Sequence, residues 1–271
     1  MGRPVSAAGA PVGLITGTGL YALEGLEDAR IERVPTPYGM ADVHRGTLAG
    51  VPVAHVPRHG AGHARLSHQV DPRVNVAAIA ATGARALIST TVCGAVDPSL
   101  ELGSLVVFDD LHFPQNRLAD GSLCTLFTGP EIPGRGHWIY ELPFGDGVCA
   151  GVLHGAREAG IAVRDGGTYG HVDGPRLNTR SEIAQLAAAG VTCVSQTGGP
   201  ETVLAGEARL PFALVGFVTD HANGVTEEPT PAETLARLFG ESAGVFQRML
   251  AGALPAVAAD PGEPAGIMFA L

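Results

Sequence analysis

Short apolar runs that end at glycine or polar residues recur along the chain, with helical spacing between them. The runs predict buried strands at residues 12–16, 51–56, 86–92 and 105–108, near 168–172, and at 191–195 and 212–219. The spacing of apolar residues predicts helices at 70–84, 148–160, 182–189, 201–208 and 231–254. This alternation predicts an α/β fold in which helices flank a sheet and ligands bind at the carboxyl ends of strands.

Two segments lie outside this alternation. Residues 112–147 are rich in Gly and Pro, with Phe, Trp and Tyr among them, and predict a long functional loop. Residues 1–11 contain no apolar run that would suit a signal peptide or a membrane helix, so we expect a flexible start and a cytoplasmic protein that does not bind membranes.

Composition narrows the class of protein. With 271 residues, 45% hydrophobic and 16% charged, the chain can bury the core of a single domain spanning residues 1–271, with two domains as the alternative. A net charge of -10 argues against a nucleic-acid-binding face, so an anionic small substrate would need a local positive pocket. The four cysteines lack C-x-x-C spacing, which favours free thiols and no metal site.

Polar motifs follow the predicted strands. They are Gly17-Thr18-Gly19-Leu20, Arg58-His59-Gly60, Ser89-Thr90-Thr91-Val92-Cys93-Gly94, Asp173-Gly174-Pro175-Arg176, Thr197-Gly198-Gly199-Pro200-Glu201 and Thr219-Asp220. Because the carboxyl ends of strands in such a sheet gather at one edge, we expect these motifs to form one site.

Several of these residues suit an anion. The turn around Thr18 lets backbone N–H groups approach closely, and its hydroxyl is a further donor. Arg58 offers a planar fork that matches phosphate oxygens, His59 can donate another hydrogen bond, and Thr91 adds a hydroxyl. A dinucleotide site is the competing interpretation, but the third glycine of G-x-G-x-x-G is missing after Gly19.

Taken in order, the motifs between residues 12 and 225 resemble the methylthioadenosine phosphorylase branch of the trimeric purine nucleoside phosphorylase family. The resemblance implies a mixed, twisted and partly barrel-like sheet, a homotrimer, and inorganic phosphate as co-substrate with no organic cofactor and no metal. It implies a phosphate site at Thr18, Arg58, His59, Thr91 and Thr197, Gln196 near the ribose hydroxyls, and a base site lined by Leu177, Asn178, Asp220 and Asn223.

The expected chemistry needs a proton donor for the leaving purine. Asp220 is the candidate for protonating N7, and its carboxyl must be neutral to donate. Apolar neighbours such as Leu177 and Phe217 would favour the neutral form.

The residues expected at the base depart from the family pattern. Adenine-specific relatives carry Asp-x-Asp, whereas this chain reads Asp220-His221-Ala222. Relatives acting on 6-oxopurines have Asn at the position of Asp220 and often Glu at that of Asn178. An amide at Asn178 or Asn223 both donates and accepts, so it suits either O6 or N6. Leu177 replaces an aromatic residue and Gln196 a methionine of the adenine branch.

The 5′ end of the nucleoside is expected to contact His137, Trp138 and apolar residues of the last predicted helix. We therefore predict phosphorolysis of a purine nucleoside, with 5′-deoxy-5′-methylthioadenosine as the leading substrate. The alternatives are a 6-oxopurine nucleoside phosphorylase for methylthioinosine or inosine, a hydrolytic nucleosidase, and a nucleoside-binding protein without catalysis.

Overall fold

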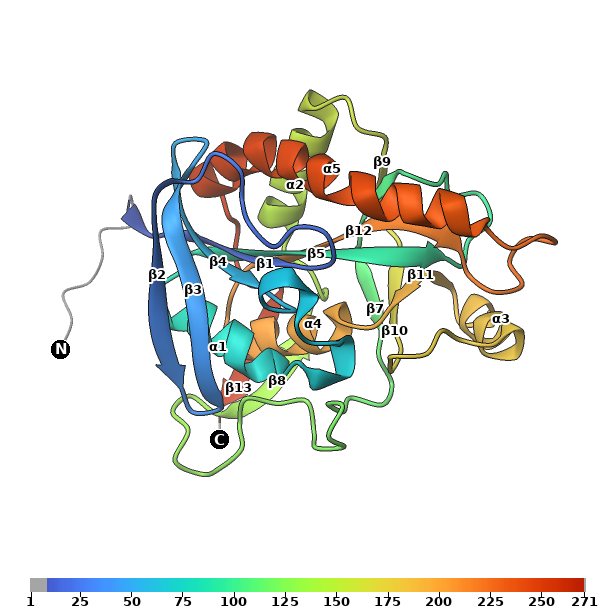
Figure 1. The fold of residues 1–271 in the computed structure, drawn as a ribbon. Coiled ribbons are helices and arrows are strands. Elements are labelled where there is room, and N and C mark those ends of the chain that lie inside the picture. The colour runs from blue at the N-terminus through green and yellow to red at the C-terminus, as the bar shows by residue number, and fades with distance from the viewer. Residues whose placement is uncertain (1–8, 271) are drawn as a thin grey trace.

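A twisted sheet of 11 strands runs through the molecule, with helices on both faces (Figure 1). The computed structural model describes residues 9–270, so most of the segment 1–11 expected to be flexible lies outside the described residues. The strands are β1 Val12–Thr16, β2 Glu27–Thr36, β3 Gly39–Leu48, β4 Val51–Pro57, β5 Ala86–Ala95, β6 Leu105–Val107, β7 Asp110–His112, β8 Gly136–Tyr140, β9 Val163–Asp165, β10 Thr168–His171, β11 Val191–Ser195, β12 Phe212–His221 and β13 Gly266–Ala270. The helices are α1 Pro72–Ala81, α2 Asp146–Glu158, α3 Arg180–Ala188, α4 Gly198–Glu207 and α5 Ala232–Ala259.

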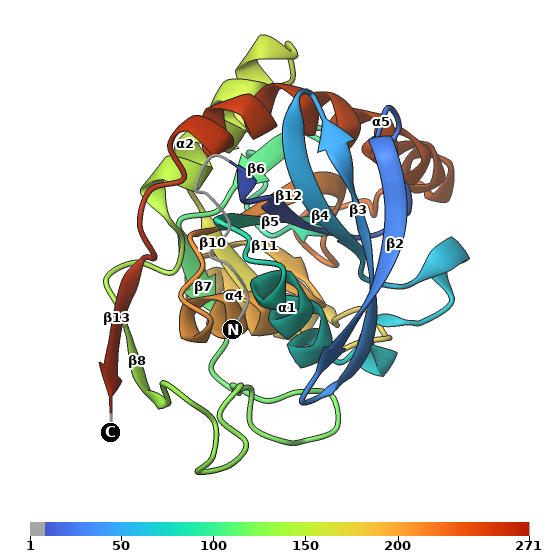
Figure 2. The same ribbon diagram turned by 90° about the vertical axis from the view of Figure 1, so that its left-hand side faces the viewer.

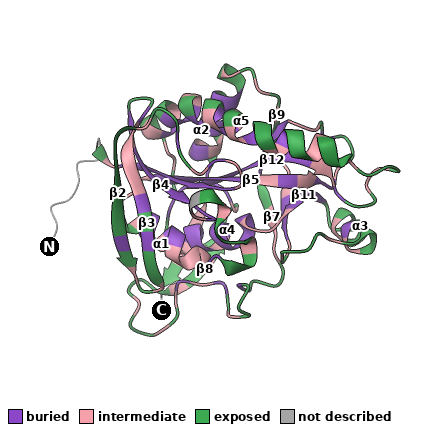
Figure 3. Ribbon diagram, viewed as in Figure 1, coloured by how far each residue is buried: buried purple, intermediate pink, exposed green. Residues whose placement is uncertain are grey.

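Helices α2 and α5 cover one face of the sheet, and α1 and α4 lie on the other (Figures 1 and 2). Along β1, Leu14 packs in the cluster that contains residues of α2 and α5, whereas the next residue, Ile15, packs in the cluster with α1 and α4. Leu87 and Ile88 of β5 divide between the two clusters in the same way. Strands β1, β5 and β12 are buried along most of their length (Figure 3). Because successive side chains of a strand point to opposite faces, strands buried on both faces read as continuous apolar runs.

The α/β fold predicted from the sequence is confirmed, and each predicted strand and helix has a counterpart. The hairpin of β2 and β3 was missed because β2 is an edge strand whose side chains are mostly exposed, with Ile31 64% exposed. The segment 112–147, predicted as a long functional loop, also contains β8, which the prediction missed and which pairs with β13 near the C-terminus.

The last helix continues five residues beyond the predicted end at residue 254, through Pro255 to Ala259. Proline removes one backbone donor from a helix. Val257 of the final turn is nevertheless buried, because it packs against α2 at Gly151, where an added Cβ would lie 2.5 Å from the valine Cγ2. This close packing of two helices holds the turn in place.

Within residues 9–270, no helix is both long enough and apolar enough to cross a membrane.

Buried histidines make the fold sensitive to acid. Burial lowers the pKa of His55 and of His171 to about 3. Between that value and the unfolded value of 6.5, only the unfolded chain binds protons at these rings, so stability falls as the pH is lowered through this window. Each ring contributes up to about 1.4 kcal/mol per pH unit.

We therefore expect His171→Asn to flatten the dependence of the unfolding free energy on pH between pH 6.5 and pH 3, measured by urea denaturation. His154→Asn, at an exposed position of α2, is the matched control and should leave the slope unchanged. Equal slopes for wild type and His171→Asn would contradict a neutral buried ring at this position.

Candidate functional site

The site lies where β5 changes neighbours. Its first half, up to Ser89, pairs with β1, and Gly94 and Ala95 pair with β11. Among the described residues, neither strand pairs with residues 90–93 on this edge of β5. A cavity of about 320 Å³ opens at the gap. Such a divergence of neighbouring strands is where α/β sheets commonly bind ligands.

The structure brings nearly all the predicted site residues to this one cavity. Its lining includes Thr18, Arg58, His59, Thr91, Leu177, Asn178, Gln196, Thr197, Asp220 and Asn223. Thr90 does not line it, and its carbonyl oxygen instead accepts a hydrogen bond from Arg58 Nη1 at 3.0 Å.

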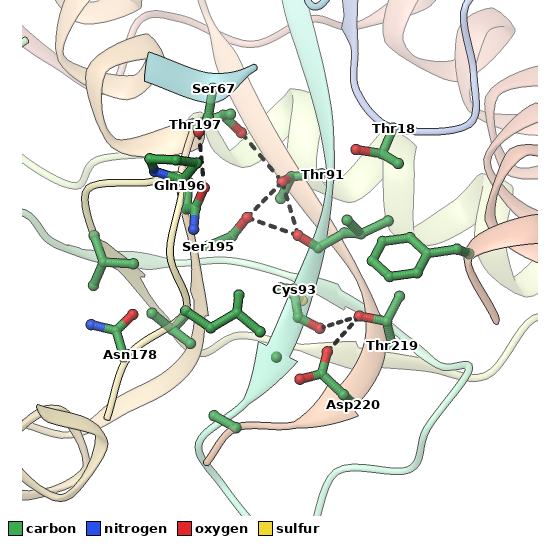
Figure 4. A pocket seen from close by; sticks show the side chains of 18 of the residues that line it. Thr18, Ser67, Thr91, Cys93, Asn178, Ser195, Gln196, Thr197, Thr219 and Asp220 are labelled. Carbon is green, nitrogen blue, oxygen red and sulfur yellow. Dashed lines mark hydrogen bonds between the residues drawn. The ribbon is translucent and has the colours of Figure 1, made fainter. Parts of the chain in front are cut away.

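One end of the cavity carries a cluster of hydroxyl groups (Figure 4). Thr91 Oγ1 lies 3.0 Å from Ser195 Oγ and 3.3 Å from Thr197 Oγ1, and Ser195 Oγ donates to the carbonyl oxygen of Val92 at 2.8 Å. Sequence reasoning missed Ser195, although its position at the end of β11, directly before Gln196, was the available signal. Uncharged donors at a strand end and at the start of α4 suit an oxyanion.

Arg58 stands behind this hydroxyl cluster and is 1% exposed. Its Nε donates to Glu201 Oε1 at 2.6 Å, and its Nη2 donates to Glu201 Oε2 at 2.8 Å and to Ser89 Oγ at 2.7 Å. The expectation of a guanidinium fork open to phosphate was therefore wrong, because the fork holds Glu201. Nη1 faces the turn after β1, where a Cβ on Gly17 would lie 2.5 Å from it. Only Nη1 remains directed toward the Thr18 turn.

His59 is also buried, and its ring stacks on that of His63 with centroids 4.2 Å apart. Its Nδ1 lies 3.0 Å from the carbonyl oxygen of Arg65, so Nδ1 carries the hydrogen and donates it. Burial, followed by the positive charge of Arg58, lowers the pKa of His59 to about 3. With the hydrogen on Nδ1, Nε2 of the neutral ring is an acceptor, and a hydrogen bond donated by His59 to an anion stays a prediction.

Asp220 lies at the other end of the cavity, close to Thr219 (Figure 4). Thr219 Oγ1 is 2.7 Å from Asp220 Oδ1 and 3.2 Å from the carbonyl oxygen of Cys93. The Thr219 hydroxyl has one hydrogen, which it can donate to Asp220 Oδ1 across the shorter contact or to the Cys93 carbonyl. Thr219 thus helps to position the Asp220 carboxyl at this end of the cavity.

The apolar surroundings expected for Asp220 differ from those observed. Leu177 lines the cavity but is 69% exposed, and Phe217 is buried in the cluster beneath α5 without lining the cavity. Gly94 of β5 lies beside the carboxyl instead, because an added Cβ there would lie 3.2 Å from Asp220 Oδ2. The missing side chain of Gly94 gives the carboxyl its room.

We expect Gly94→Ala to lower turnover by about tenfold, because the methyl group displaces the Asp220 carboxyl by a few tenths of an ångström. Steady-state kinetics at saturating substrate checks this. Gly240→Ala on α5, where an added Cβ has nothing within 4 Å, is the matched control. Equal turnover in both variants would show that this contact does not position Asp220.

The two asparagines expected at the base lie beside Asp220. Asn223 Nδ2 donates to the carbonyl oxygen of Asn178 at 2.6 Å, and Asn178 Nδ2 donates to Glu182 Oε2 at 3.4 Å. Glu182 is held there by Arg176 and by the capping box that begins α3 at Thr179. Each amide nitrogen uses one of its two hydrogens on a protein oxygen, so each side chain keeps one N–H and its oxygen for a ligand.

Gln196 forms part of the wall between this cavity and a second one of about 320 Å³. Its Oε1 accepts from Ser67 Oγ at 2.8 Å and its Nε2 donates to the carbonyl oxygen of Arg176 at 3.0 Å. A contact of Gln196 with ribose hydroxyls stays a prediction.

The structure does not bring His137 or Trp138 to the cavity. His137 is exposed on β8 and pairs with Phe269 of β13, while Trp138 packs against Gly206 of α4. His137 does not line the cavity of its own chain, and its place in the 5′ pocket stays a prediction. The helix α5 does contribute, through Leu235 and Phe239.

Comparison with known proteins agrees with this arrangement. The sequence model of the phosphorylase superfamily matches residues 11–255. The chain is 36% identical to a probable 6-oxopurine nucleoside phosphorylase of Korarchaeum cryptofilum over 79% of this chain and 81% of the relative. It is 34% identical to an S-methyl-5′-thioadenosine phosphorylase of Mycobacterium tuberculosis, over 92% of this chain and 90% of the relative. Its fold matches that of methylthioadenosine phosphorylase from Schistosoma mansoni in complex with adenine, with a TM-score of 0.83 and 26% sequence identity. The match covers 93% of this chain and 92% of that chain.

Proposed function

The chain belongs to the phosphorylase superfamily, and from this premise we propose that it is a purine nucleoside phosphorylase. The leading substrate is 5′-deoxy-5′-methylthioadenosine, which it would split with inorganic phosphate into adenine and 5-methylthioribose 1-phosphate. The observation that carries this proposal is one cavity with anion donors at one end and the Asp220 carboxyl at the other (Figure 4).

The reaction needs both ends of the cavity at once. As the bond from C1′ to N9 breaks, the sugar acquires the positive charge of an oxocarbenium ion, and phosphate held beneath it stabilises that charge and attacks C1′. Thr18, Thr91 and Thr197 provide the hydroxyl groups for the phosphate. At the far end, Asp220 gives a proton to N7, so the purine leaves as a neutral base.

The amides of Asn178 and Asn223 suit adenine, because their side-chain oxygens can accept from its exocyclic amine. Each amide nitrogen also keeps a second hydrogen, so the same pair can donate to the oxygen of a 6-oxopurine. The proposal of adenine is supported by the relatives named as methylthioadenosine phosphorylases. The 6-oxopurine alternative is supported by the relative from Korarchaeum cryptofilum, whose name gives that activity.

Three further properties are part of the proposal. Phosphate serves as nucleophile and counter-charge, so the mechanism calls for no organic cofactor and no metal. A homotrimer is proposed on the family resemblance, and exposed apolar side chains on the β8–β13 ribbon, including Ile139 and Phe269, are compatible with a subunit contact there. Light scattering of the purified protein tests this. The cytoplasmic location stays a prediction from the sequence.

The substrate is tested by incubating the protein with methylthioadenosine, methylthioinosine, adenosine and inosine, each with and without phosphate, and separating the products by chromatography. The proposal expects phosphate-dependent release of adenine, most rapidly from methylthioadenosine. Release of hypoxanthine alone would assign the site to 6-oxopurines, and ligand-dependent thermal stabilisation without any product would indicate a nucleoside-binding protein.

A further inference from the structure

The turn that carries Thr18 is closed by its own backbone. Its first residue, Gly17, directly follows β1, and the Gly17 carbonyl oxygen accepts from the Leu20 N–H at 3.3 Å. Its third residue, Gly19, has a φ of +89°, the sign that a type II turn requires at this position. Thr18 lines the cavity, and its hydroxyl oxygen points toward Thr91 in Figure 4. The conformation of the turn therefore determines where the Thr18 hydroxyl lies.

Two buried side chains stand behind this turn. Thr16 is the last residue of β1, and its Oγ1 lies 2.6 Å from the carbonyl oxygen of Leu20. The same Oγ1 lies 2.6 Å from Nε2 of His55, which belongs to β4. At this distance two polar heavy atoms repel each other unless a hydrogen lies between them.

Only one assignment of hydrogens satisfies both contacts. The Leu20 carbonyl has no hydrogen, so the single hydrogen of the Thr16 hydroxyl must be donated to it. The hydrogen in the other contact must then come from His55, so its Nε2 is the donor. Burial, followed by the nearby ring of His44, lowers the pKa of His55 to about 3, so the ring is neutral and carries its hydrogen on Nε2.

We propose that His55 and Thr16 are positioning residues of the phosphate site. The His55–Thr16 relay runs from the ring N–H through the Thr16 hydroxyl to the Leu20 carbonyl, and it holds the turn in the conformation in which Thr18 faces the anion. Neither residue of the relay lines the cavity, so both act through the turn. The inference rests on the proposed function, since it takes the anion to be the phosphate co-substrate.

The relay should affect the binding of phosphate more than the chemical step. When it is broken, the Leu20 carbonyl loses its partner and the turn gains freedom, which phosphate must remove on binding to Thr18. Once phosphate is bound the donor is in place, so the barrier from the bound complex changes little. The backbone of Thr16 is a separate contact, because its carbonyl oxygen accepts from the Arg58 N–H at 2.9 Å, and a side-chain substitution keeps that bond.

Thr16→Val keeps the shape of the side chain and removes its hydroxyl. We expect the KM for phosphate to rise about tenfold, while kcat at saturating phosphate and the KM for methylthioadenosine stay within about twofold of wild type. Thr16→Ser retains the hydroxyl and should keep the KM for phosphate within about twofold of wild type. Thr82→Val is the matched control, because Thr82 Oγ1 donates to the Ile79 carbonyl at the same 2.6 Å at the end of α1, outside the cavity lining. It should leave all three constants unchanged.

A double-mutant cycle tests whether His55 acts through Thr16. His55→Phe keeps a ring and removes the donor, and it is expected to raise the KM for phosphate about threefold, because the Thr16 hydroxyl keeps its bond to Leu20 but loses its own donor. In the Thr16→Val background the same change should have no further effect, since the relay is already broken. Additive effects, or an unchanged KM for phosphate in Thr16→Val, would overturn the inference and leave the proposed function standing.

The tautomer of His55 tests the relay without any activity. Nitrogen NMR of the isotopically labelled wild-type protein at neutral pH is expected to show the ring hydrogen of His55 on Nε2, with and without inorganic phosphate. A hydrogen on Nδ1 would refute the relay even if none of the variants folded. If the wild type does not bind phosphate in isothermal titration, the proposed function fails and the inference fails with it.

Discussion

Asp220→Asn is expected to lower the turnover of methylthioadenosine by about 10²- to 10⁴-fold, the usual contribution of a general acid. An asparagine amide keeps the size of the side chain and can donate a hydrogen bond to N7, but it cannot transfer a proton. Because Asp220 lies at the far end of the cavity from the hydroxyl cluster of Thr91, the KM for phosphate should change little (Figure 4). Separate kcat and KM values for each substrate are the measurement.

The matched control for this variant is Asp165→Asn, which removes an exposed carboxylate that pairs with Arg157 on the surface. It should leave kcat unchanged. If Asp220→Asn lowers kcat and weakens phosphate binding to the same extent, the variant has disturbed the whole cavity, and Asp220 is not the proton donor.

Arg58→Met is expected to lower the free energy of unfolding by about 3–5 kcal/mol, because it leaves the charge of Glu201 buried without a partner. It should also raise the KM for phosphate about 10- to 100-fold, since a charged donor beside the Thr18 turn is lost. Urea denaturation measures the first effect and steady-state kinetics the second.

The two effects can be separated by removing the buried polar partners together. Adding Ser89→Ala and Glu201→Leu to Arg58→Met should recover more than half of the lost stability, because no uncompensated buried charge remains. The KM for phosphate should stay high. Recovery of a normal KM in this triple variant would mean that Arg58 acts on phosphate only through the stability of the fold.

The parts of the site that follow buried strands could be predicted from the sequence. Thr18, Thr91 and Asp220 stand at or near the carboxyl ends of apolar runs, and those ends meet at one edge of the sheet. The same rule places the first turn of α4 beside them. Local sequence therefore predicted the elements that bring these residues together, and the family resemblance implied their roles.

What the sequence could not provide was how these residues use their hydrogen bonds. Glu201 reads as an ordinary acidic residue in the first turn of a helix, and its pairing with Arg58, 143 positions away, appears only in the folded chain. The acceptor role of His59 depends on the turn that brings the Arg65 carbonyl to its ring. The surroundings of His137 are likewise fixed by pairing with the C-terminal strand, which its local sequence does not show.

The edge elements escaped prediction for a related reason. Strand β2 has mostly exposed side chains, so it lacks the alternation or the apolar run that marks a strand. Its hydrogen bonds to β3, and not its own side chains, determine its conformation. The pattern of apolar residues in the sequence thus predicts the strands at the centre of the sheet, but it predicts the edge strands poorly.

The central claim is that phosphate, and not water, attacks C1′ of the sugar. The most direct measurement is the ratio of 5-methylthioribose 1-phosphate to adenine formed by the wild-type protein from methylthioadenosine, followed by phosphorus NMR and chromatography of the same samples. The account predicts equal amounts of the two products and no adenine in phosphate-free buffer. Adenine released at a similar rate without phosphate, together with free methylthioribose, would contradict it.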